Sequence, residues 1–346
     1  MPTPEEIQRD RRLDPRVKRM LKALPAPDQP DAATREEVVA AANTPAGLAI
    51  REAISVAMEK NDVEELAPSI GLAWETLEFT SAPDGNSVKL NFIRPEGGDV
   101  VPCVVYLHGG GMMTGSAFDG NYRAFGKLLA AQGVGVAMID FRNCLVPSSS
   151  GELAAYPGGL NDCISAVRWV AANAGALGVD GARVVVAGES GGGNLTLATG
   201  LKLLRDGDVD IISGLYALCP YIAGRWPQED LPSTTENNGI FLNLGSNRGA
   251  LAYGIEALER GDPLAWPLFA TSDDVVGLPP VMISVNEADP LRDEGIEFYR
   301  MLLEAGVPAR CRQVMGTMHG TELMPMICPD ISRDAARDLA GFALDS

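Results

Sequence analysis

Positive charge is scarce in this chain of 346 residues. There are 28 lysines and arginines against 46 aspartates and glutamates, which gives a formal net charge of −18. Nucleic acids and anionic membrane surfaces attract basic patches, so this balance argues against both as partners. No apolar stretch approaches the roughly 20 residues of a membrane-spanning helix, and the opening MPTPEEIQRDRRLD lacks the apolar core of a signal peptide. We therefore expect a cytoplasmic protein without stable membrane insertion.

Paired cysteines and histidines are also lacking. The six cysteines are scattered without a C-x-x-C pair, which disfavours a zinc or redox motif. Several lie in apolar runs, where a buried free thiol is usual. The only histidines are His108 and His319, so acid–base chemistry by histidine must use one of them. We expect neither a metal nor an organic cofactor.

Hydrophobic patterning changes at about residue 75. Residues 1–74 have spaced apolar residues at helical period, interrupted at Pro25, Pro27 and Pro30. Residues 75–95 predict an antiparallel strand pair. Short apolar runs then alternate with helical segments, which is typical of strands buried on both faces of a parallel sheet. The pattern predicts about eight strands in an open α/β sheet.

A stretch rich in proline, glycine and asparagine interrupts this alternation after residue 220. A connection this long between two strands is usually functional, and it could form a lid together with the N-terminal helices. The predicted organisation is an N-terminal helical cap segment at 1–74, an α/β core at 75–220 and 271–346, and a cap insertion at 221–270.

The sharpest motif lies in VVVAGESGGGN, where Gly188, Ser190 and Gly192 form G-x-S-x-G between an apolar strand and a helix. Small flanking residues permit a tight strand-to-helix turn that exposes the serine Oγ. The helix N-terminus then offers N–H groups to an anion. A glycine-rich turn with a bystander serine is the alternative. A phosphate loop is disfavoured because G-x-x-x-x-G-K-[ST] is absent.

A serine hydroxyl needs a base to take its proton, and that base is typically a histidine oriented by a carboxylate. Where G-x-S-x-G forms a nucleophile elbow, the chain order is serine, acid, histidine, and each group lies just past a strand. Ser190 follows RVVVAGE, Asp289 follows VMISV and His319 follows ARCRQVM. Order and position together predict a Ser190–Asp289–His319 triad.

The acid is chosen from four carboxyl groups near the end of one predicted strand: Glu287, Asp289, Asp293 and Glu294. ADPL puts Asp289 in the turn immediately after the strand. Asp293 and Glu294 are better placed in the first turn of the next helix, where acidic side chains are favourable. Asp289 is therefore preferred.

His108 precedes the serine, so it fails the order test, and it opens the glycine run HGGG. Next to a nucleophile elbow, such a loop supplies part of the oxyanion hole. Glycines let its backbone approach the substrate and aim N–H groups at one point. We assign Gly110 and Gly111 as donors, together with Gly191 of the elbow, and expect His108 to brace the loop.

HGGG (108–111), GESGGG (188–193), DPLRDEG (289–295) and HG (319–320) together resemble the hormone-sensitive-lipase-like branch of the α/β hydrolases, the bacterial family IV carboxylesterases, over roughly residues 75–345. DFRNC, DPLAWPLFA and VNEADPLRDEGI resemble the heroin (acetyl) esterase type more closely still. The resemblance implies an α/β-hydrolase fold, with a mostly parallel eight-stranded sheet flanked by helices and a helical cap. Glu189 and Gly191 depart from the common GDSAGG form, which indicates a subgroup with a looser loop.

Apolar residues near these motifs are candidates for the substrate pocket. Flexible thioethers suit adaptable apolar recognition, and aromatic residues of the insertion could line the alcohol side. Ordinary packing in the core or lid is the alternative. The candidates are Met112, Met113, Trp226, Phe241, Trp266 and Met318.

The resulting hypothesis is a serine carboxylesterase acting on a small-molecule ester through an acyl-enzyme intermediate. The resemblance supplies the preference for short, acetyl-type acyl groups and the expectation of a homodimer. An amidase or lactonase with the same triad is one alternative. A non-catalytic ligand receptor on a degenerate hydrolase fold is another, and it is disfavoured because all three triad positions are filled.

Overall fold

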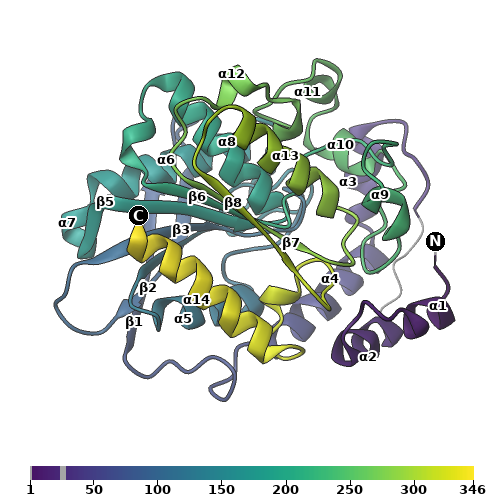
Figure 1. Ribbon diagram of the computed structural model, residues 1–346, viewed down its shortest axis with the longest axis horizontal. Coiled ribbons are helices and arrows are strands. Elements are labelled where there is room, and N and C mark those ends of the chain that lie inside the picture. The colour runs from purple at the N-terminus through teal and green to yellow at the C-terminus, as the bar shows by residue number, and fades with distance from the viewer. Residues whose placement is uncertain (1, 24–28) are drawn as a thin grey trace.

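A computed structural model describes residues 2–23 and 29–346. One eight-stranded sheet lies at the centre of the molecule (Figure 1). Its strands are β1 (Leu72–Thr80), β2 (Ser87–Pro95), β3 (Val101–Leu107), β4 (Gly135–Ile139), β5 (Val179–Glu189), β6 (Gly214–Leu218), β7 (Val281–Asn286) and β8 (Ala309–Val314). The predicted α/β fold with about eight strands is confirmed.

The strand order is β1-β2-β4-β3-β5-β6-β7-β8. β2 is antiparallel to both of its neighbours, and all the later junctions are parallel. β5 is an example of why the central strands are continuous apolar runs. Val184 and Val186 pack into the core on one face of the sheet, and Val185 and Ala187 pack into the core on the other, because successive side chains point to opposite faces. Helices cover both faces, so both sets must be apolar.

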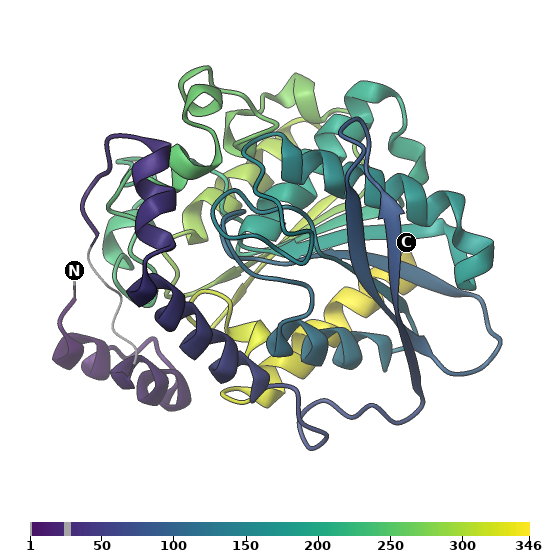
Figure 2. The ribbon, with the colours of Figure 1, turned by 180° about the vertical axis from the view of Figure 1, so that it is seen from behind.

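Two helical layers cover the sheet (Figures 1 and 2). α6, α8 and α13 pack on one face, and α5 and α14 pack on the other. These helices are α5 (Gly120–Ala130), α6 (Gly158–Ala172), α8 (Gly191–Asp206), α13 (Arg292–Glu304) and α14 (Pro329–Asp345). Among the described residues, no helix is both long and apolar enough to span a bilayer.

Within residues 2–23 and 29–71, four helices precede the sheet and lie along one side of the molecule (Figure 1). They are α1 (Pro4–Arg9), α2 (Pro15–Ala23), α3 (Arg35–Ala42) and α4 (Pro45–Glu59). The side chains of Thr34 and Thr44 cap α3 and α4 by accepting a hydrogen bond from a first-turn N–H. The predicted breaks at Pro25 and Pro27 lie outside the described residues, whereas Pro30 precedes α3.

The stretch between β6 and β7 contains only short helices: α9 (Ser233–Glu236), α10 (Arg248–Tyr253), α11 (Ile255–Glu259) and α12 (Ser272–Val275). It contacts the N-terminal helices directly, because α10 packs on α3. The Arg12 guanidinium also donates a 2.8 Å hydrogen bond to the Asn237 side chain. The N-terminal helices and this stretch therefore lie side by side.

Candidate active site

Ser190 lies at the sharp turn between the last residue of β5 and the first residue of α8. Its backbone has φ 59° and ψ −117°, a conformation that a residue with a side chain adopts only at a cost. Close packing enforces the turn, since a Cβ at Gly192 would lie 2.0 Å from the Leu107 carbonyl oxygen. This is the geometry that G-x-S-x-G predicts for an exposed serine at the end of a strand.

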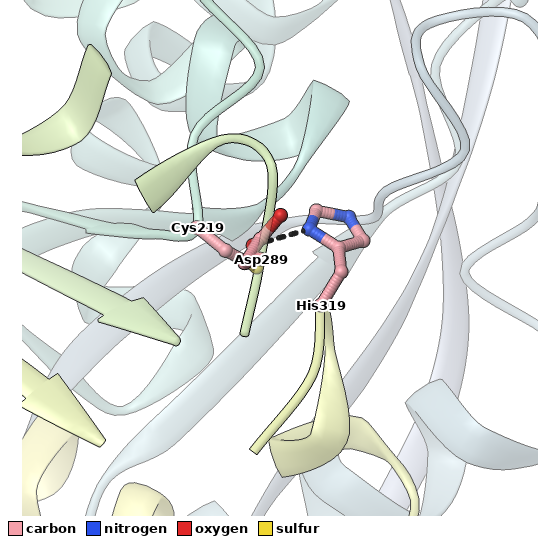
Figure 3. A group of neighbouring side chains, drawn as sticks. All are labelled: Cys219, Asp289 and His319. Atoms are coloured by element: carbon pink, nitrogen blue, oxygen red, sulfur yellow. Dashed lines mark hydrogen bonds and ion pairs between the residues drawn. The ribbon is translucent and has the colours of Figure 1, made fainter. Parts of the chain in front are cut away.

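Asp289 and His319 form a buried pair (Figure 3). His319 Nδ1 lies 2.7 Å from Asp289 Oδ2, and the other carboxylate oxygen accepts a hydrogen bond from Leu291 N at 2.9 Å. The ring's second nitrogen, Nε2, points away from Asp289. Burial alone would lower the pKa of His319, but the Asp289 carboxylate outweighs burial and raises that pKa well above its usual value.

The other three acid candidates are engaged elsewhere. Glu287 accepts a hydrogen bond from Gly316 N at 2.8 Å, and Asp293 accepts one from Ser233 N at 2.7 Å. Glu294 accepts hydrogen bonds from Ile222 N and Ala223 N. Asp289 is therefore the only one of the four that contacts His319 through a hydrogen bond in the described part of the chain.

Cys219 is a third buried neighbour of this pair. Its Sγ lies within 4.8 Å of ligand atoms of Asp289 and His319 (Figure 3). Burial raises the pKa of the thiol to about 12, so the group is uncharged at neutral pH. A thiolate, an imidazole and a carboxylate could together hold zinc. An ion at this place would have to break the 2.7 Å bond between His319 and Asp289.

His108 is buried and does not line the cavity that contains Ser190. Its ring stacks on Phe141 with 4.1 Å between centroids, and Nδ1 lies 2.9 Å from the Gly109 carbonyl oxygen. Burial lowers the pKa of His108. These contacts fix the start of the HGGG loop and hold the ring away from Ser190.

The HGGG loop approaches the elbow closely. Gly110 and Gly111 have φ of 96° and 64°. A Cβ at Gly191 would lie 2.5 Å from Met112 N and 2.7 Å from Gly111 N. The absence of a side chain at 191 thus lets the two backbones approach closely. The sequence predicts a looser loop instead. Gly191 therefore contacts the Gly111 backbone, and Gly110 and Gly111 line the cavity together with Ser190.

Gly191→Ala, which restores the common family residue, should lower kcat by about tenfold to a hundredfold, a fraction of what losing one oxyanion donor costs. The added methyl would meet the backbone nitrogens of Gly111 and Met112, so the loop would have to move away from Ser190. Steady-state kinetics on one ester measure the effect. Gly341→Ala is a matched control, because nothing lies within 4 Å of its Cβ position. Unchanged kcat in Gly191→Ala would contradict a role for this close approach.

Glu189 joins the elbow to the HGGG loop. Its buried carboxylate accepts a 2.9 Å hydrogen bond from the Tyr122 hydroxyl, and the same hydroxyl oxygen accepts one from Gly109 N at 2.8 Å. Burial raises the pKa of Glu189. This link accounts for a glutamate beside the serine, and no sequence pattern indicates Tyr122 as its partner.

A cavity of about 850 Å³ contains Ser190 and His319. Three of the six predicted pocket residues line it: Met113, Trp226 and Phe241. The other three do not line it, and for them the prediction is wrong: Met112, Trp266 and Met318 are fully buried in the core. Residues of α3, α4 and the stretch 241–249 also line the cavity, which places both proposed cap segments beside Ser190.

Glu294 holds the aromatic wall of this cavity. Its buried carboxylate accepts a 2.7 Å hydrogen bond from Trp226 Nε1, and Trp226 stacks on Tyr221 with 4.5 Å between centroids. Trp266 packs edge-on behind both rings. Burial raises the pKa of Glu294 to about 8, against the effect of its N–H donors. The wall is thus fixed by a buried acid that the sequence places in the first turn of a helix.

Comparison with known proteins identifies the fold and the family of the chain. A family model described as alpha/beta hydrolase fold matches residues 104–323. Carboxylesterase NlhH of Mycobacterium tuberculosis is 33% identical over 282 residues, which is 80% of this chain and 84% of that protein.

The solved structures extend the likeness to nearly the whole chain. Esterase Est22 with p-nitrophenol is 57% identical, with a TM-score of 0.96, over 98% of this chain and 100% of that one. Brefeldin A esterase, described as a bacterial homologue of human hormone-sensitive lipase, is 35% identical, with a TM-score of 0.82, over 98% and 95%. Bacterial heroin esterase is 28% identical, with a TM-score of 0.76, over 97% and 99%. The chain is therefore a carboxylic ester hydrolase of the α/β-hydrolase fold and belongs to the hormone-sensitive-lipase-like family.

Proposed function

We propose that the chain is a serine carboxylesterase that hydrolyses short-chain, acetyl-type esters through an acyl-enzyme at Ser190. The observation that carries the proposal is that His319, which lies 2.7 Å from Asp289, lines the same cavity as Ser190. Ser190 Oγ has no hydrogen-bond partner among the described residues. A serine poised for attack often gains its bond to the histidine only when substrate binds.

In the acylation step, His319 Nε2 takes the proton of Ser190 as Oγ attacks the ester carbonyl carbon. The carbonyl π electrons move to the oxygen and form a tetrahedral oxyanion. When this intermediate collapses, the bond to the alcohol oxygen breaks, and His319 gives its proton to the departing alcohol. Asp289 holds the ring through Nδ1 and stabilises the imidazolium between these two proton transfers.

In the deacylation step, His319 removes a proton from water, whose oxygen attacks the acyl carbon. A second oxyanion forms, and its collapse breaks the bond to Ser190 Oγ, which regains the proton from His319. The free acid leaves and the enzyme is restored. The imidazole must be neutral at the start of each step. Its raised pKa makes it a stronger base, but the neutral form is then populated only at a correspondingly higher pH.

The oxyanion of both steps needs N–H donors that are fixed before the reaction. The backbone N–H groups of Gly110, Gly111 and Gly191 are the proposed donors. Gly191 begins α8, whose N-terminus adds a favourable partial positive charge. The close contact of Gly191 with the Gly111 backbone supports a single binding point. Loss of one such donor costs about 2.7–4 kcal/mol.

A panel of p-nitrophenyl esters with acyl chains from acetate to octanoate tests the substrate proposal. We expect kcat/KM to be highest for the short acyl groups and turnover to be absent in a Ser190→Ala control. Matched amide and lactone substrates should react far more slowly. A clear preference for long acyl chains, or for amides or lactones, would overturn the proposed substrate class while leaving the triad in place.

A further inference from the structure

The wall of the Ser190 cavity differs in charge from the rest of the molecule. The chain has a formal net charge of −18, yet among the described residues the Arg, Lys, Asp and Glu side chains that line this cavity are Arg51, Arg248 and Glu189. Glu189 is buried, and burial raises its pKa, which favours the neutral acid. Two arginines therefore line a cavity in which the one carboxyl group from the described residues, that of Glu189, already accepts a hydrogen bond from Tyr122.

Arg248 is the first residue of α10 and is only partly exposed. Across residues 2–23 and 29–346, every other arginine that is buried or partly buried donates hydrogen bonds to the protein: Arg12, Arg16, Arg35, Arg51, Arg94, Arg123, Arg142, Arg183, Arg292 and Arg312. Among the buried and partly buried arginines of the described residues, only the Arg248 side chain has no hydrogen bond, ion pair or ring contact. A guanidinium has five N–H donors, so Arg248 can offer several of them to a ligand in the cavity.

The position of Arg248 connects it to the reacting centre. A Cβ at the next residue, Gly249, would lie 2.4 Å from the Tyr221 hydroxyl oxygen and 3.9 Å from Met113 Cε. A Cβ at Gly111, in the HGGG loop, would lie 2.9 Å from the same Met113 atom. The first turn of α10 and the oxyanion loop are thus neighbours across one side chain, and one substrate can contact both.

We propose that Arg248 makes the cavity selective for esters that carry a free carboxylate away from the scissile carbonyl. The proposal rests on the proposed function, because it names the substrates of the same Ser190 cavity. A guanidinium binds a carboxylate through two parallel hydrogen bonds. One guanidinium matches one negative charge, which favours a carboxylate over a doubly charged phosphate in a strongly acidic protein. The 850 Å³ cavity is also far larger than an acetyl group requires.

Two matched pairs of esters test the proposal. 4-Acetoxybenzoate and its methyl ester place the carboxylate on the alcohol part, and mono-4-nitrophenyl succinate and its methyl ester place it on the acyl part. The members of a pair differ in intrinsic reactivity, so the quantity compared between variants is the anionic-to-neutral ratio of kcat/KM. In Arg248→Gln this ratio should fall by about tenfold or more for at least one pair, mainly through KM.

The controls separate Arg248 from its surroundings. Arg225→Gln removes the same charge from an exposed arginine of the insertion that does not line the cavity, and it should leave both ratios unchanged. Arg51→Gln removes the second lining arginine, which already donates to the Ala42 carbonyl. Partial loss of folded enzyme lowers both members of a pair equally, so the ratio remains readable. Benzoate should also inhibit the wild-type enzyme more strongly than benzamide.

Three results would overturn the assignment: equal ratios in wild type and Arg248→Gln for both pairs, loss of the preference in Arg51→Gln alone, or equal inhibition by benzoate and benzamide. Failure of the proposed function looks different, because Ser190→Ala would then hydrolyse neutral and anionic esters alike. Hydrolysis of the neutral ester of each pair by Ser190→Ala measures that outcome directly.

Discussion

Ser190→Ala should lower kcat by about 10⁴–10⁶-fold while the protein stays folded. The serine Oγ is the only atom lost at the reacting centre, and without it no acyl-enzyme can form. The turn does not depend on the serine hydroxyl. The backbone of residue 190 is held by the hydrogen bond from its N–H to the Leu218 carbonyl at 2.9 Å, which alanine keeps. Initial rates on p-nitrophenyl acetate measure the loss, and a thermal melt checks the fold.

Ser332→Ala is the matched control for this substitution. Ser332 is also buried, but it lies on α14 and bonds to the Cys328 carbonyl, away from the residues that line the cavity. Its removal should leave kcat within about twofold. A Ser190→Ala enzyme with near wild-type turnover would refute the proposed nucleophile.

His319→Ala should lower kcat by a similar factor, about 10⁴–10⁶-fold. The substitution removes the group that takes and returns the proton in both steps, and it leaves Asp289 as an unpaired buried carboxylate. Pre-steady-state release of p-nitrophenol should lose its fast phase.

The contrast with His108→Ala decides between the two histidines. His108 packs against Phe141 and does not line the cavity, so its loss should destabilise the HGGG loop and lower activity only in part. The remaining activity should still depend on His319, so the double variant should be as inactive as His319→Ala. A His108→Ala enzyme that is less active than His319→Ala would reverse the assignment.

The strands and the three candidate triad residues could be predicted because local sequence determines them. The central parallel strands β3 to β7 contain short apolar runs, and Ser190, Asp289 and His319 each follow the end of a strand. The positions of the strand ends in the sequence therefore predict which residues form the site. The sequence could favour Asp289 over Asp293 and Glu294 because ADPL predicts a turn after the strand and the other two belong to the next helix, and the hydrogen bond of Asp289 to His319 agrees with that choice.

The lining of the cavity could not be predicted in the same way, because it depends on how separate segments pack. Met112 and Met113 are adjacent in sequence, yet Met112 points into the core and Met113 lines the cavity. Trp226 and Trp266 come from one insertion, and the second packs behind the first. Arg248 gave no sequence signal, because its lack of a partner is a property of the folded chain.

Covalent labelling of Ser190 tests the central claim most directly. A p-nitrophenyl phosphonate ester mimics the tetrahedral intermediate and should react once, releasing one equivalent of p-nitrophenol as activity is lost. Peptide mapping by mass spectrometry should then place the phosphonyl group on Ser190, with no labelling in Ser190→Ala and much slower labelling in His319→Ala. Full esterase turnover by enzyme labelled at Ser190, or loss of activity with the label on another residue, would contradict the account.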